Sequence, residues 1–299
     1  MPYLPTTYFL LEEDASRYET SRAAILPLPF ERTTSYGKGT VEGPAAILRA
    51  SQALELYDEE LGSEPYTMGI ATLPPFHPEA HDLGEALREI GAEAKRHMEA
   101  GKLLVSLGGE HSLTSPLVGA AREVHGDVGR AGGGLGVVQF DAHADLRDEF
   151  EGTEWSHAAV MRRVVEAGTP TLSVGIRSLS APEARFARER ELPILWGREL
   201  ADPDLPERFR KHLEKLPETV YLTFDIDYFD PSLVPATGTP EPGGGTWYPT
   251  LALLRELFRA KRVVAMDLVE LAPIGGHPAS DFLAAKLVYK LLAYWQAGR

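Results

Sequence analysis

The chain has 299 residues, of which 43% are hydrophobic and 25% charged, and its formal net charge is −14. This size and apolar content suffice for one large α/β domain over 1–299 with a substantial core. The acidic balance argues against nucleic acid and anionic membranes as partners and favours a cationic small molecule. No apolar run approaches the roughly 20 residues of a bilayer span, and the N-terminus lacks a basic leader, so we expect a cytoplasmic protein.

Eight short apolar runs, rich in β-branched residues, predict strands. In chain order they centre on Ile25 and Ile70 and then begin at residues 102, 135, 171, 192, 219 and 262. Apolar residues three and four apart predict helices over 81–101, 156–168, 206–216 and 248–262. Continuous apolar strands separated by single helices predict a three-layer α/β/α fold with a mainly parallel sheet of about eight strands.

Acidic and histidine side chains follow four of these strands at their carboxyl ends, where open parallel sheets bind ligands. In chain order they are Glu110 and His111; Asp141, His143 and Asp145; Asp225, Asp227 and Asp230; and Asp267 and Glu270. Residues two apart on an extended chain point the same way, so the members of one group can converge. Each motif alone could instead be a helix cap or a turn.

The sequence contains no cysteine, so a metal would be held by histidine and carboxylate side chains. Several carboxylates close together raise one another's pKa unless a cation neutralises them. Six ligands with room for a reactive water suit two ions that share bridging carboxylates. Thiol-free, oxygen-rich ligation favours two Mn(II) per chain, with Co(II), Zn(II) or Fe(II) as alternatives.

The motifs "GGEHS", "DAHAD", "SHAAVMRRV", "DIDYFDPS", "GTPEPGG" and "DLVEL" occur in this order. They resemble the ureohydrolase superfamily of arginases and agmatinases, and the agmatinase branch most closely. The resemblance extends through "PFERTTSYGKGTVEGPAAILRAS" and covers about residues 25–295. It implies an arginase-type fold, two Mn(II) ions and assembly into homo-trimers or hexamers.

The resemblance also implies roles for individual residues. Asp141 and Asp225 would bridge the two ions. The remaining ligands would be His111 and Asp145 on one ion, and His143 and Asp227 on the other.

Two further residues match family positions that act on the substrate. His157 matches the proton-shuttle histidine, although a histidine that begins a helix is usually a surface residue. Glu270 matches the carboxylate that pairs with the guanidinium group, although it could also form an ordinary strand-end ion pair. The implied reaction is attack of hydroxide on the guanidinium carbon, with Asp145 aligning the hydroxide, followed by release of urea and an amine.

The loop "LRDEFEGTEWSH" departs from arginases, which hold the amino and carboxylate groups of arginine with Asn and Ser side chains there. Its acidic residues would repel a carboxylate and attract a second cation, which favours agmatine or aminopropylagmatine. The candidate substrate-binding residues are Asp148 and Glu149, with Glu151 and Glu154 beside them. Leu271 and Ala272 replace the family's usual "VN" after the glutamate and could admit a longer substrate.

Three alternatives remain open at this point. The chain could be an arginase or a guanidino-acid hydrolase. It could be a metal-dependent acetylpolyamine deacetylase, which would keep one metal ion instead of two, or a polyamine-binding scaffold without activity.

Overall fold

The computed structural model describes residues 7–126 and 134–298 and confirms the predicted sheet. All eight predicted strands are present: β1 (Ala23–Leu28), β2 (Ile70–Thr72), β3 (Leu103–Gly108), β4 (Leu135–Phe140), β5 (Thr171–Ile176), β6 (Ile194–Trp196), β7 (Thr219–Asp225) and β8 (Arg262–Val269). They form one sheet in the order β2-β1-β3-β8-β7-β4-β5-β6, and every neighbouring pair is parallel.

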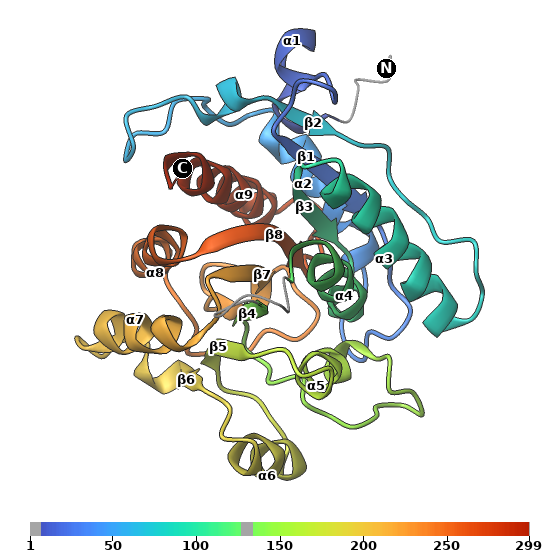
Figure 1. Cartoon of the computed structure of the whole chain (residues 1–299), viewed down its shortest axis with the longest axis vertical. Coiled ribbons are helices and arrows are strands. Elements are labelled where there is room, and N and C mark those ends of the chain that lie inside the picture. The colour runs from blue at the N-terminus through green and yellow to red at the C-terminus, as the bar shows by residue number, and fades with distance from the viewer. Residues whose placement is uncertain (1–6, 127–133, 299) are drawn as a thin grey trace.

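Helices cover both faces of this sheet, as predicted. They are α1 (Glu13–Ser16), α2 (Gly43–Ser51), α3 (Leu83–Glu99), α4 (Thr114–His125), α5 (Val160–Glu166), α6 (Ala181–Glu189), α7 (Leu205–Lys215), α8 (Trp247–Ala260) and α9 (Ala279–Ala297). Figure 1 shows α7, α8 and α9 on one side of the sheet and α3, α4 and α5 on the other. Within the described ranges, no helix combines the length and apolar character needed to cross a bilayer.

The apolar periodicity of each helix decides which surface it buries. In α3 the side chain of Asp82 accepts the N–H of Glu85 at 2.9 Å and so caps the first turn. Leu87, Ile90 and Met98 lie on the buried face of α3 and pack into one of two core clusters. The second cluster lies under α2, α7, α8 and α9. Burial on both faces explains why the strands are continuously apolar.

The strand order brings the chemically important strand ends together. The four central strands, β3, β8, β7 and β4, are the four that end in acidic or histidine residues. Their registers pair Leu107 with Leu268, Phe224 with Phe140, and Asp225 with Val269. The carboxyl ends are therefore level, and the residues that follow them share one edge of the sheet.

Position 109, just after β3, requires glycine because the backbone of Phe30 passes very close to it. A Cβ at this position would collide with the carbonyl oxygen of Phe30. We expect Gly109→Ala to destabilise the fold by about 1–3 kcal/mol, as overpacking does, and to lower the urea midpoint. Gly119→Ala in α4 is the control, because an added Cβ there meets nothing within 4 Å and helical alanine is favoured. Equal midpoints for both variants would contradict this account.

Candidate metal centre and active site

A cavity of about 370 Å³ at the carboxyl edge of the sheet brings most of the predicted site residues together. Those that line it are His111, His143, Asp145, His157, Asp225, Asp227 and Glu270. Asp141 lies beneath them and is fully buried.

The histidine and aspartate side chains form two overlapping groups of metal-type ligand atoms. His111, Asp141 and Asp145 form one group, and Asp141, His143 and Asp227 form the other, with the ligand atoms of each group within 4.8 Å of one another. Asp225 adjoins the first group, because its Oδ2 lies 3.4 Å from His111 Nδ1. Asp141 therefore belongs to both groups, as a bridging ligand would.

A hydrogen-bonded chain orients the imidazole of His111. Asp267 accepts the hydroxyl hydrogen of Thr223 at 2.7 Å, so the Thr223 oxygen is left to accept Nε2–H of His111 at 2.9 Å. The Nδ1 lone pair then faces the carboxylates. This Nδ1 is buried and makes no hydrogen bond, although it lies 3.0 Å from Asp145 Oδ2. A buried lone pair aimed at carboxylate oxygens fits a divalent cation between them.

The pKa values of the clustered side chains also indicate a site for cations. Burial, together with the carboxylates of Asp145 and Asp227, raises the pKa of Asp141 to about 7. Burial also raises the pKa of Asp225 well above its ordinary value. Although burial opposes its charge, the Asp227 carboxylate at 2.8 Å raises the pKa of His143 to about 11. The cluster thus binds extra protons when no other cation is present, and its donor set fits two divalent ions.

Gln139 is part of this site and was not predicted from the sequence. Its Nε2 donates to Asp141 Oδ2 at 2.7 Å, and its Oε1 accepts the hydroxyl of Ser173 at 2.7 Å. The sequence did contain a sign of this role, because Gln139 is a polar residue inside a buried strand. It lies two positions before Asp141, so the two side chains point to the same side of the strand.

Glu270 and Asp145 have unusual backbone conformations. Glu270 has a φ of +64° and Asp145 a φ of +52°, in the left-handed region that such residues rarely adopt. Glu270 Oε1 accepts the N–H of His111 at 2.6 Å, and burial raises the pKa of this carboxyl well above its usual range. Backbone strain of this kind is retained where a side chain must point into a site.

His157 occupies the wall of the same cavity. It begins a short 3₁₀ helix (His157–Ala159), and Ser156 caps this turn by accepting the N–H of Ala158 at 3.3 Å. The His157 ring packs edge to face against Phe150, with the ring centroids 5.8 Å apart. The predicted helix over 156–168 is thus α5 with this turn in front of it.

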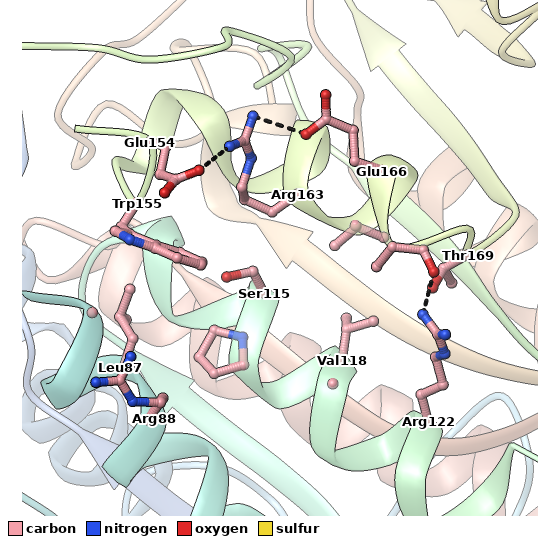
Figure 2. Close-up of a pocket in the computed structure, with 15 residues that line it drawn as sticks. Leu87, Arg88, Ser115, Val118, Arg122, Glu154, Trp155, Arg163, Glu166 and Thr169 are labelled. Carbon is pink, nitrogen blue, oxygen red and sulfur yellow. Dashed lines mark hydrogen bonds and ion pairs between the residues drawn. The ribbon is translucent and has the colours of Figure 1, made fainter. Parts of the chain in front are cut away.

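The acidic side chains of the loop after β4 lie outside the cavity. Neither Asp148 nor Glu149 lines it, so the structure does not bring these two candidate substrate-binding residues together with the others. Asp148 pairs instead with Arg163 at 3.2 Å. Figure 2 shows Arg163 between Glu154 and Glu166, beside a separate cavity of about 450 Å³ formed by α3, α4 and α5. Arg163 of α5 pairs with Asp148 and Glu154 and so holds these two carboxylates outside the cavity of the His–Asp cluster, whereas Arg147 and Phe150 of the same loop line it.

Two other carboxylates line the cavity in its place. Glu183 is already engaged, because it accepts the backbone N–H of Leu146 at 3.0 Å and of Ser180 at 2.7 Å. Glu241 has no side-chain hydrogen bond or ion pair with any described residue, while its backbone carbonyl accepts Nη2–H of Arg177 at 2.8 Å. Glu241 thus has an anchored backbone and a carboxylate that no described residue neutralises, and "GTPEPGG" was the motif that contained it.

Two other acidic residues predicted at the ends of β7 and β8, Asp230 and Asp267, differ in position. Asp267 supports His111 through Thr223, as described above. Asp230 is half-buried and closes a loop, because its carboxylate accepts the Ser232 hydroxyl and the N–H of Gly243, and these bonds lower its pKa to about 2. Asp230 therefore orients the loop that carries Glu241. It does not orient any ligand of the cluster.

Comparison with known proteins agrees with this geometry. The model of the arginase family matches residues 21–293. The N(1)-aminopropylagmatine ureohydrolase of Synechocystis sp. is 43% identical over 96% of this chain and 93% of its own length. The protein of the same name from Thermus thermophilus is 41% identical over 93% and 91%. The crystal structure of agmatine ureohydrolase of Thermoplasma volcanium superposes with a TM-score of 0.84 at 28% identity, covering 99% of this chain and 96% of that one.

Proposed function

The chain belongs to the arginase family, and on that premise we propose that it hydrolyses a guanidino polyamine to urea and an amine. One observation carries the proposal. The same cavity contains the His–Asp cluster and two carboxylates, Glu270 and Glu241, that can each pair with a cationic group of a substrate. A guanidino polyamine has a guanidinium group at one end and at least one ammonium group beyond it, so it matches this distribution of charge.

We assign two divalent ions per chain to the cluster, with Asp141 and Asp225 shared between them. His111 and Asp145 complete one set of ligands, and His143 and Asp227 the other. Mn(II) suits these hard donors, with Co(II), Zn(II) or Fe(II) as alternatives. When bound, two such ions would neutralise the carboxylates and lower the pKa of water, so that hydroxide is available near neutral pH.

The chain's own residues then bind and orient the reactants. Glu270 uses its second carboxylate oxygen, which accepts no hydrogen bond from a described residue, to pair with guanidinium N–H groups. Asp145 accepts a hydrogen bond from the attacking water and aligns it with the guanidinium carbon. His157 gives a proton to the leaving amine, because the tetrahedral carbon cannot expel an unprotonated one.

We propose aminopropylagmatine as the preferred substrate, with urea and spermidine as products. The names of the two relatives reported above support this choice. Glu241 supplies a binding group for the additional ammonium of the longer tail. A substrate carboxylate, as in arginine or guanidinobutyrate, would be repelled by Glu241.

The test is urea release by the Mn(II)-loaded protein from aminopropylagmatine, agmatine, arginine and guanidinobutyrate. We expect the largest kcat/KM with aminopropylagmatine and little urea from the two carboxylates. If two metal ions are bound and none of these compounds releases urea, the proposal fails. Deacetylation of acetylpolyamines, or polyamine binding without turnover, would then be measured.

Glu241→Gln isolates the proposed tail contact. Loss of a charge-assisted hydrogen bond costs about 1.5–3 kcal/mol, so KM for aminopropylagmatine should rise about 10–100-fold while kcat changes little. Glu149→Gln is the charge-matched control, since Glu149 is exposed and outside the cavity. A KM effect in Glu149→Gln and none in Glu241→Gln would restore the assignment made from the sequence.

We further propose assembly into a homo-trimer or hexamer and a cytoplasmic location, which the family resemblance supports. The side chains of Tyr36 and Tyr248 are 82% and 74% exposed in the single chain and are surfaces that association would cover. Light scattering of the purified protein measures the assembly, and a particle of monomer mass would contradict it.

A further inference from the structure

His157 contacts a threonine that is held in turn by a buried glutamate. Thr33 Oγ1 lies 3.1 Å from His157 Nδ1 and accepts the backbone N–H of His157 at 3.0 Å. The same hydroxyl donates to Glu110 Oε1 at 2.8 Å. Neither Thr33 nor Glu110 lines the cavity, and Glu110 is fully buried. The histidine is thus supported from behind, on the side away from the substrate.

The hydrogens in this chain of contacts can be assigned, because a hydroxyl group has one hydrogen. Glu110 is an acceptor throughout: its Oε2 accepts the N–H of Arg32 at 2.5 Å and of Thr33 at 2.6 Å, and its Oε1 also accepts the Ser112 hydroxyl. The hydrogen of the Thr33 hydroxyl is therefore directed at Glu110. The Thr33 oxygen can then only accept from His157, which places a hydrogen on Nδ1.

Ser156 is the other hydroxyl near this ring nitrogen. Its Oγ lies 3.3 Å from His157 Nδ1 and accepts the N–H of Ala158. Ser156 could donate to Nδ1 only if that nitrogen carried no hydrogen. The Thr33 oxygen would then face an imidazole lone pair at 3.1 Å without any hydrogen between them. The arrangement with Nδ1–H directed at Thr33 avoids this repulsion.

We propose that Thr33, held by Glu110, fixes His157 in the tautomer with hydrogen on Nδ1, so that Nε2 gains and gives up the proton during hydrolysis. Thr33 and Glu110 are then positioning residues, comparable to the partners that orient metal-bound histidines. The kinetic part of this inference rests on the proposed function. The tautomer is a property of the resting protein and can be measured separately.

The ¹⁵N shifts of the histidine ring nitrogens report the tautomer in protein loaded with diamagnetic Zn(II), and loss of a signal in His157→Gln assigns it. We expect Nδ1–H in the wild type and in Thr33→Ser. In Thr33→Val the ring should shift toward the Nε2–H form, which the neutral histidine side chain favours in water. Ser156→Ala is the matched control and should keep Nδ1–H. A wild-type ring with hydrogen on Nε2, or an unchanged ring in Thr33→Val, overturns the proposal.

Kinetics test the positioning role. Loss of a supporting partner of this kind costs about 10–100-fold, so Thr33→Val should lose that much kcat with little change in KM, and Thr33→Ser should recover it. Full kcat in Thr33→Val overturns the role. If Thr33→Val does not fold, the spectra of the wild type and of Ser156→Ala still show whether His157 carries its hydrogen on Nδ1. If the wild type releases no urea, the proposed function fails while the spectra still settle the tautomer.

Discussion

Asp141→Asn is expected to remove bound divalent metal and to lower kcat by more than about 100-fold, the upper range for loss of a residue that merely supports a ligand. Asp141 belongs to both groups of ligand atoms, so one substitution weakens both ion sites. Its carboxylate also accepts N–H groups from Gln139 and His143, so the amide of the variant would place a donor against a donor. Metal content per chain and urea release measure the two effects.

Thermal unfolding with and without metal separates this loss from misfolding. In the metal-free protein, Asp141→Asn removes a buried carboxylate that Asp145 and Asp227 destabilise but leaves a buried amide donor facing another donor, so these opposing effects should leave the unfolding temperature close to that of the wild type. The added stability from metal should disappear, since binding to the native state stabilises it. Asp202→Asn, on an exposed ion pair with Arg208, is the charge-matched control. An Asp141→Asn protein that retains two ions would refute the assignment.

His157→Gln is expected to lower kcat by about 10²–10⁴-fold, the usual contribution of a positioned acid or base. The side chain lines the cavity but belongs to neither group of ligand atoms, so metal content should stay at the wild-type level. KM should change little, because the proton is transferred only in the reaction. Steady-state kinetics and metal analysis check both points.

The control for this variant is His81→Gln. His81 is exposed, and its backbone carbonyl, not its side chain, accepts a hydrogen bond from Arg32, so kcat should not change. Wild-type kcat in His157→Gln would mean that another group protonates the leaving amine. The role of Thr33 would lose its kinetic consequence at the same time.

The eight strands and the members of the His–Asp cluster could be predicted from the sequence. Both are local patterns: a strand such as β7 is a continuous apolar run because both of its faces are buried, and Asp225 and Asp227 are two residues apart. The cost of gathering carboxylates without a cation, together with their spacing at strand ends, then predicted a metal site. The family model and the structural superposition confirm the family and the fold.

Which side chains support or neutralise the residues around that cluster could be seen only in the tertiary structure. Sequence order does not place β4 beside β7 or bring Thr33 to His157, because these contacts depend on the order of strands in the sheet. The charge of a loop residue also does not reveal its partner: Arg163 pairs with Asp148, while no residue in the described part of the chain pairs with the Glu241 side chain at the cavity. Periodicity and residue type act over a few neighbouring positions, whereas pairing between distant side chains is settled by which opposite charge or hydrogen-bond donor the fold brings closest.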